Sequence, residues 1–364
     1  MKTQKKVKNI LFRLNLVGQG VVNNDSNDQK HILGRMKGME HIKGGYYNNM
    51  SFAKKNFYRD GDGNVTSKLK ISSDCLRHEL FSGDVFAQTP NITHDTNVLC
   101  SFIASPVGIV RGYMFTDGEE TLKRKSALSI TDAEQTNDAL SYLETCSRSG
   151  EKTQKEDENS QGDTTFFKKE TIGNVTYDAV GAIDLKQLQF VSTDSLFDRY
   201  ALNPDDFSIY KNFLRLRMPT FNSELGYYTM NGSAVDLAEY GVKLSSEDVQ
   251  VLVNDILRRL NNLTIQKTSA YARVAKMEYK LVYDPFVDTF DNESGWSSLD
   301  GKAIAFEPED FYTEQDTKKA EKLRETVNAN RAVFLAGRKD KKAEEKAAKA
   351  EAKKTKKDKA EASA

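Results

Sequence analysis

The sequence predicts an α+β fold, in which strands and helices are mixed along the chain rather than strictly alternating. Residues 7–17 alternate between apolar and polar side chains, as in a half-buried strand, and residues 274–283 show the same period of two. Residues 246–261 place apolar side chains at helical spacing, which predicts an amphipathic helix. This irregular order of elements argues against a doubly wound parallel sheet.

The N-terminal strand places Ile10, Phe12, Leu14 and Leu16 on one face and Arg13 and Asn15 on the other. It runs into Gly18-Gln19-Gly20, which resembles the start of a dinucleotide-binding loop. Asn23 stands where the third glycine belongs, and no helix signal follows. We therefore do not predict a dinucleotide site.

Residues 23–70 are rich in Asn, Gly and Lys, with scattered aromatic side chains and little periodicity. A basic segment interleaved with aromatics favours a loop that orders on a nucleic-acid strand. Residues 144–162 are polar and almost devoid of large apolar side chains, so we expect a mobile surface loop there.

Shorter elements lie between these landmarks. Ser72-Ser73-Asp74 predicts an N-cap for a helix over 74–82, and Pro106 and Gly108 interrupt buried elements over 98–116. Strands are expected over 172–192, with turns at Gly173-Asn174 and at Gly181.

The C-terminal third contains the clearest helix, over 246–261, capped by Ser245 or Ser246. In the strand over 274–283, the polar face carries Lys276, Glu278 and Lys280. We expect residues 1–315 to form the folded body, 316–337 a C-terminal helix, and 338–364 a disordered Lys/Ala/Glu tail.

The net charge is zero, but the charge is unevenly distributed. Residues 1–70 carry 14 Lys and Arg against 5 Asp and Glu, whereas residues 130–165 carry 3 against 9. Such a chain can bind a polyanion on one face and offer an acidic face to a neighbouring subunit.

Several classes of protein are disfavoured. No run of about 18 apolar residues predicts a transmembrane helix, and the N-terminus lacks the apolar core of a signal peptide, so we expect a cytoplasmic protein with no membrane partner. The three cysteines form no CxxC pair, and the four histidines lack metal-ligand spacing. No catalytic motif is present, so we predict no enzyme, no cofactor and no metal.

Basic side chains that lie beside glycines and aromatics are the candidate contacts to RNA, because phosphates need cations and a close approach needs glycine. The candidates lie in four segments of the chain and in the long basic loop. They are Arg77 and His78; Gly108, Arg111 and Gly112; Lys123, Arg124 and Lys125; Phe166 and Phe167; and Arg35, Lys37, Lys54 and Lys55.

Three of these regions together resemble the crRNA-coating backbone subunit of the type I-F variant Cascade, a CRISPR interference complex. They are Leu16–Asn23; Cys75–Phe81 with Ile109–Tyr113; and Asp163–Phe167 with Gln187–Ser192 and Phe197–Arg199. The similar stretches span about residues 6–265. The homologous backbone subunit of type IV effectors is the close alternative.

The resemblance implies an RRM-like or ferredoxin-like palm with inserted web and thumb loops. It implies that several copies polymerise along the guide spacer as a helical filament and present it to target DNA, together with other Cascade subunits. Arg77 and His78 would hold guide phosphates, and Gly108, Arg111 and Gly112 would form the glycine-rich contact to the RNA backbone. The Lys/Ala/Glu tail matches nothing in the family.

Two other functions fit the same residues. The first is an RNA endonuclease of the same superfamily, in which guide-processing members use His, Tyr or Lys and some backbone subunits cut target RNA with a loop Asp. His78, or Asp25 and Asp28, would be the catalytic candidates here. The second is a generic single-strand RNA-binding protein outside CRISPR. It predicts no regular spacing of protein copies along the RNA.

Overall fold

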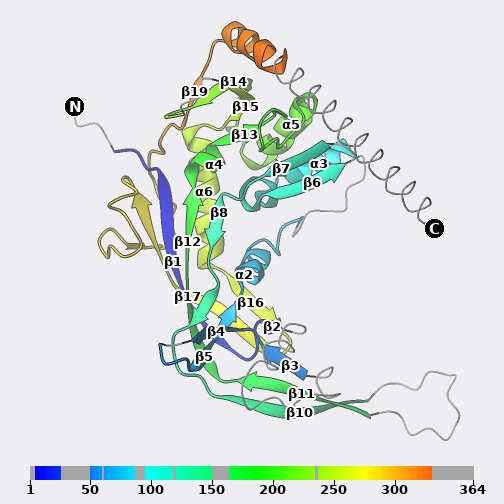
Figure 1. The fold of residues 1–364 in the computed structure, drawn as a ribbon, viewed down its shortest axis with the longest axis vertical. Coiled ribbons are helices and arrows are strands. Elements are labelled where there is room, and N and C mark those ends of the chain that lie inside the picture. The colour runs from blue at the N-terminus through cyan, green and yellow to red at the C-terminus, as the bar shows by residue number, and fades with distance from the viewer. Residues whose placement is uncertain are drawn as a thin grey trace, which may run out of the picture. The chain divides into compact units, whose positions relative to one another are not determined.

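The computed structural model describes residues 5–25, 50–59, 61–86, 95–117, 120–149, 164–233 and 237–329 (Figure 1). The chain divides into two compact units. The first contains residues 1–224 and 242–309, and the second contains residues 225–241 and 310–364.

A large sheet organises the first unit around β1 (Asn9–Gln19). This strand pairs antiparallel on one side with β12 (Asn174–Asp184) and on the other with β17 (Ala270–Val282). The strand order is β16-β17-β1-β12-β9-β5-β4, with β18 beside β17 and β8 beside β12. The remaining strands of this sheet are β4 (Lys55–Arg59), β5 (Val65–Ile71), β8 (Leu128–Ile130), β9 (Ala133–Gln135), β16 (Thr264–Lys267) and β18 (Ser297–Ser298).

The apolar face of this sheet is covered by α4 (Leu185–Gln189) and α6 (Ser246–Asn261), which contact β1 and β17 respectively. Ser245 caps α6 and forms a capping box with Asp248, as the sequence predicts for this helix. The core consists of side chains from the inward stripes of β1 and α6: Ile10, Phe12, Leu14, Leu16, Leu252, Val253, Ile256, Leu257 and Leu260.

Gly181 is not a turn residue, which corrects the expectation from the sequence. It lies inside β12, opposite Phe12 of β1. A Cβ atom at Gly181 would lie 2.2 Å from Cζ of the Phe12 ring and 2.3 Å from the Ser129 carbonyl oxygen. Glycine is therefore needed here because an aromatic ring and a neighbouring backbone occupy the space of its side chain.

The polar face of the sheet is crossed by the segment 284–298, which we call the strap. Lys280 was expected to be exposed, but it is 2% exposed because its ammonium donates to the carbonyls of Thr289 and Asn292. Arg13 lies 4.1 Å from the centre of the Trp296 ring and Lys280 lies 5.1 Å from it. Arg13 and Lys280 of the sheet thus both anchor the strap.

A second sheet has the strand order β10-β11-β3-β2, with β10 (Ser141–Ser149) and β11 (Thr164–Ile172) forming a long hairpin. Residues 144–149 are therefore strand, although their polar composition predicted a loop, because pairing with β11 satisfies their backbone. The rest of that predicted loop lies outside the described residues. The other two strands are β2 (Asn24–Asp25) and β3 (Met50–Ala53).

The long loop predicted over 23–70 is also partly sheet, since β4 and β5 form a hairpin within it. Strand β5 pairs with β9, and the Lys70 ammonium lies 2.8 Å from Asp132. The basic N-terminal region and the acidic region that begins at residue 130 therefore meet inside one chain. Part of their charge is neutralised there.

The rest of the first unit is mostly helical. It contains α2 (Ser73–Leu80), α3 (Thr96–Ile103), the π-helical turn η3 (Val107–Arg111), the hairpin of β6 (Tyr113–Asp117) and β7 (Glu120–Arg124), β13 (Phe190–Ser192), η4 (Pro204–Asp206) and α5 (Phe207–Arg217). Helix α3 packs against α5. The helix expected at 74–82 is confirmed, with Ser72 as its N-cap.

In the second unit, β14 (Leu225–Met230) pairs antiparallel with β19 (Tyr312–Glu314). The strand β15 (Glu239–Lys243) begins in this unit, and residues 317–329 are helical. The remainder of the predicted C-terminal helix and the whole Lys/Ala/Glu tail lie outside the described residues.

Helices and antiparallel sheets are thus combined in one chain, which confirms the α+β class. None of the helices in the described ranges is long and apolar enough to cross a membrane.

Candidate nucleic-acid interface

Helix α2 positions the first two candidate residues. The Ser72 hydroxyl accepts a hydrogen bond from the Cys75 backbone N–H at 3.4 Å, which starts the helix. Leu76 and Leu80 are buried, so the other side of α2 faces outward. Arg77 is half-buried on that side, and His78 is exposed.

Arg77 and Arg111 form a pair of neighbouring cations. Nη2 of Arg77 donates to the Arg111 carbonyl oxygen at 2.8 Å, and Arg77 Nε has no acceptor within the described part of the chain. Burial lowers the pKa of the Arg111 guanidinium, and the charge of Arg77 lowers it further, while Asp74 opposes both. A phosphate beside these two guanidiniums would relieve their repulsion and would bind through charge-assisted hydrogen bonds.

The two predicted glycines approach protein backbone. A Cβ atom at Gly108 would lie 2.4 Å from the Ile103 carbonyl oxygen. Gly112 has a φ of +78°, and a Cβ atom there would lie 2.4 Å from the Arg124 carbonyl oxygen. Both glycines are required by the packing of the chain on itself, and they shape the turn that carries Arg111.

Arg124 is a buried structural residue, which corrects its place among the surface candidates. Its side chain is enclosed, and the residue is 4% exposed. Nε donates to the Ile109 carbonyl at 2.9 Å, while Nη1 and Nη2 each donate at 2.7 Å, to the carbonyls of Phe190 and Gln187. These bonds join β7 to η3 and to the α4–β13 segment.

The two lysines that flank Arg124 differ from it and from each other. Lys123 forms an ion pair with Asp198, whose carboxylate is exposed. Lys125 is exposed, and no ion pair to it is present in the described ranges. Of the triplet, Lys125 is therefore the residue best placed to meet an external phosphate.

The candidates in the long basic loop are only partly described. Lys54 and Lys55 lie where β3 passes into β4, and both are half-buried. The Lys54 backbone N–H donates to the Asn23 carbonyl at 2.8 Å, which ties this junction to the residue before β2. Arg35 and Lys37 lie outside the described residues.

The two candidate aromatics, Phe166 and Phe167, lie on β11, where their backbones are opposite Ser147 and Cys146 of β10. The structure thus places both of them on the long hairpin, away in sequence from α2 and η3.

The catalytic candidates of the endonuclease reading are not brought together as a metal site. Asp25 lies on β2, and Asp28 is outside the described residues. Within those ranges, no group of three or more His, Cys, Asp and Glu side chains could hold a metal ion.

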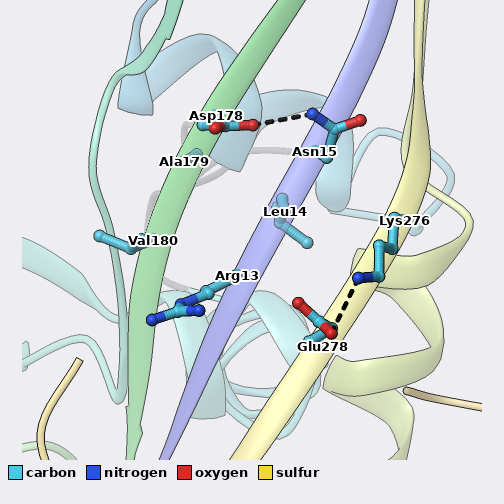
Figure 2. Close-up of a pocket in the computed structure, with 8 residues that line it drawn as sticks. All are labelled: Arg13, Leu14, Asn15, Asp178, Ala179, Val180, Lys276 and Glu278. Atoms are coloured by element: carbon cyan, nitrogen blue, oxygen red, sulfur yellow. Dashed lines mark hydrogen bonds and ion pairs between the residues drawn. The ribbon is translucent and has the colours of Figure 1, made fainter. Parts of the chain in front are cut away.

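A shallow pocket on the polar face of the large sheet was a competing candidate (Figure 2). It is lined by residues of β1, β12 and β17, including Arg13. Asn15 Nδ2 donates to Asp178 at 2.8 Å, and the Lys276 ammonium lies 2.9 Å from Glu278. Because these charges are paired within the sheet, the pocket offers an anion little net positive charge.

Sequence reasoning missed two cations that hold α2 in place. Lys267 of β16 lies 2.7 Å from Glu79, and Arg259 of α6 lies 2.7 Å from Asp84. No sequence signal links these pairs, because their members lie more than 170 positions apart in the chain.

Comparisons with known proteins agree with the resemblance. The family model of type I-Fv CRISPR-associated proteins described as Cas7fv-like matches residues 6–285. A chain of a CRISPR RNA-guided surveillance complex is 8% identical with a TM-score of 0.29, covering 74% of this chain and 68% of that one. A chain of such a complex in a pre-nicking state is 9% identical with a TM-score of 0.36, covering 74% and 75%. No curated protein matches.

The two structural similarities are too low to support an argument, so the family match carries the assignment. It extends over most of the chain and includes α2, η3, β10, β11 and the whole of the large sheet except β18. It also decides between the type I-F variant and the type IV alternative. The chain belongs to the Cas7fv-like family of type I-Fv CRISPR-associated proteins.

Proposed function

We propose that this chain is the crRNA-binding backbone subunit of a type I-F variant Cascade complex. Several copies polymerise along the guide spacer and present it for pairing with target DNA, alongside other Cascade subunits. The observation that carries the proposal is the Arg77–Arg111 cation pair on an outward-facing helix and turn of a Cas7fv-like chain.

The chemistry of the interface suits this function. A guide-binding protein must accept every spacer sequence, so its contacts go to phosphates and 2′-hydroxyls rather than to base edges. Guanidiniums bind phosphate oxygens through two donors at once. Arg77, Arg111, His78 and Lys125 are therefore the residues to which we assign phosphate contacts.

The fold supplies candidates for the parts of a backbone subunit. We assign the RRM-like palm to the large sheet with α4 and α6. We assign the thumb to the hairpin of β10 and β11, which projects beyond the end of that sheet in the first unit (Figure 1). In this assignment Phe166 and Phe167 lie on the thumb.

Nuclease protection tests the proposal. The protein is purified with its RNA, digested with ribonuclease, and the protected fragments are sized. Polymeric guide coating predicts a ladder with a spacing of about six nucleotides, because each copy of the protein covers a stretch of RNA of the same length. Protein that is free of RNA and that ignores added guide RNA at low salt would contradict the proposal.

Substitutions locate the contact. We expect Arg77→Ala with Arg111→Ala to weaken RNA binding and to reduce the salt dependence of the affinity by about one phosphate contact per residue. Lys276→Ala, which removes an exposed cation from the polar face of the sheet, is the matched control and leaves binding unchanged.

The chain is proposed to bind RNA without cutting it. The same preparations, incubated with labelled RNA, distinguish this from the endonuclease reading. If the protein cleaves RNA and His78→Ala abolishes cleavage while binding persists, the chain is an enzyme and the scaffold proposal is wrong.

A further inference from the structure

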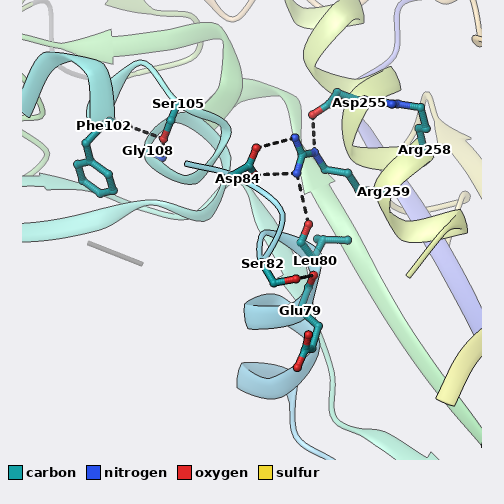
Figure 3. Close-up of polar contacts among 10 residues, drawn as sticks. All are labelled: Glu79, Leu80, Ser82, Asp84, Phe102, Ser105, Gly108, Asp255, Arg258 and Arg259. Carbon is teal, nitrogen blue, oxygen red and sulfur yellow. Dashed lines mark hydrogen bonds and ion pairs between the residues drawn. The ribbon is translucent and has the colours of Figure 1, made fainter. Parts of the chain in front are cut away.

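Arg259 of α6 clamps the segment that follows α2 (Figure 3). Its Nη1 and Nη2 donate to the two carboxylate oxygens of Asp84 at 2.7 and 3.1 Å. Its Nε donates to Asp255 at 2.6 Å, and Nη1 also reaches the Leu80 carbonyl at 3.4 Å. The guanidinium lies 5.6 Å from the centre of the Phe81 ring.

The clamp is well shielded from solvent, because the side chains of Arg259 and Asp84 are 20% and 17% exposed. A bidentate guanidinium–carboxylate pair of this kind fixes both distance and orientation. The Leu80 carbonyl is one of the last in α2, so the guanidinium also faces the negative end of the helix dipole.

Helix α2 depends on such contacts for its position. It has eight residues, and a helix that short is not stable without tertiary partners. At its N-terminal end, Asp132 accepts a hydrogen bond from the Ser73 backbone N–H at 2.8 Å. At its C-terminal end, the partners are the Lys267–Glu79 ion pair and the Arg259 clamp.

We propose that Arg259 is a positioning residue for RNA binding: it holds α2 so that Arg77 stays beside Arg111, and it does not itself contact RNA. This inference rests on the proposed function. All three guanidinium nitrogens of Arg259 already donate to protein acceptors, so they are occupied when Arg77 and Arg111 receive a phosphate.

The neighbouring residue provides the matched control. Arg258 is on the same helix and carries the same charge, but its side chain is 70% exposed and its ion pair is with Asp255 on the same helix. Within the described residues, Arg258 forms no hydrogen bond or ion pair with residues 80–84. Removing it therefore changes the charge of α6 without releasing α2.

The experiment measures the affinity of the full-length protein for a short labelled single-stranded RNA of mixed sequence, over a series of salt concentrations. The variants are Arg259→Ala, Asp84→Asn, Arg258→Ala and Arg77→Ala. Asp84→Asn breaks the same clamp from its other side, so the test stands even where Arg259→Ala does not fold. Circular dichroism confirms that each variant is folded at the assay temperature.

We expect Arg259→Ala and Asp84→Asn each to weaken binding by about threefold to about thirtyfold, the range in which residues away from a ligand act. The salt dependence of the affinity should stay as in the wild type. The fraction of molecules in which α2 is positioned to bind RNA falls, but the number of phosphate contacts in the complex does not change. The variant with both substitutions should lose little more than Arg259→Ala alone, because Arg259→Ala already removes the interaction with Asp84. Arg259→Lys, which keeps the charge, should restore part of the affinity.

Two results would overturn the inference. Wild-type affinity in folded Arg259→Ala and Asp84→Asn would show that the clamp does not serve binding. A reduced salt dependence in Arg259→Ala alone would show that Arg259 contacts phosphate directly. Failure of Arg77→Ala to weaken binding would instead contradict the proposed function, so the two failures are distinguishable.

Discussion

At the scale of single residues, side chains of the same charge in this protein have different roles according to their burial. Arg124 and Lys125 are adjacent in a basic triplet, yet the first is enclosed with its guanidinium on backbone carbonyls and the second is exposed. Removing a buried cation leaves its acceptors unpaired, whereas removing an exposed cation costs the fold almost nothing.

The first prediction concerns this pair. Arg124→Met should lower the free energy of unfolding by about 3–5 kcal/mol, because three carbonyls, two of them in buried hydrogen bonds, lose their donors. Lys125→Met should change it by less than about 0.5 kcal/mol, as for an ordinary surface position. Urea denaturation measures both. Equal stabilities for the two variants would contradict the structural role of Arg124.

A second prediction concerns Gly181. Gly181→Ala should destabilise the protein by about 1–3 kcal/mol, because the new methyl group meets the Phe12 ring and the Ser129 carbonyl, and both must move. Gly61→Ala is the control, since a Cβ atom there has no neighbour within 4 Å. Thermal unfolding followed by circular dichroism compares the two, and similar midpoints would refute the packing argument.

At the scale of elements, the strap 284–298 shows how contacts between segments hold an irregular stretch of chain against the large sheet. The strap is held on the sheet by two cations that both lie close to the Trp296 ring, and the Trp296 indole N–H donates to the Asn292 carbonyl at 3.1 Å. Its anchor therefore consists of charge, aromatic surface and hydrogen bonds together, rather than of an apolar core.

The third prediction is that Trp296→Ala releases the strap. Hydrogen–deuterium exchange should rise in residues 284–298, because Arg13 and Lys280 lose the ring that both of them contact, while exchange in α6 stays slow. Phe286→Ala is the control, since Phe286 is in the same segment and is 94% exposed. Unchanged protection of the strap in Trp296→Ala would contradict the anchoring role.

At the scale of the whole molecule, stability depends on pH through carboxylates that are paired in the fold. Burial by itself would raise the pKa of Asp132, but the Lys70 ammonium and the Ser73 N–H outweigh it, so the pKa is held below its usual value. A carboxyl group with a depressed pKa contributes stability above its unfolded pKa and loses it as the pH falls through the folded one.

The fourth prediction follows from that sign. The wild-type protein should lose stability as the pH falls below about 4, the ordinary pKa of an aspartate. Asp132→Asn should be less stable at neutral pH and should lose less on acidification, because it lacks this titration. Urea unfolding at a series of pH values measures the difference, and parallel curves for the two proteins would exclude a contribution from Asp132.

The sequence by itself determined the α+β class, a strand at about 7–17, the capped helices at about 74–82 and 246–261, and the family. Short-range periodicity and capping chemistry carry these features, and they are written in neighbouring residues. Local patterns also identified Arg77, Arg111 and His78 as candidates, because basic side chains close in sequence to an aromatic residue or to glycines form a visible pattern.

Only the tertiary structure decided which candidates are available to a ligand. Arg124 is enclosed by carbonyls from three segments, Lys280 lies under a strap, and Gly181 accommodates a ring from another strand. Arg259 meets a carboxylate 175 positions away in the chain. Such contacts depend on how distant segments pack, and a local pattern of residue types contains no information about that packing.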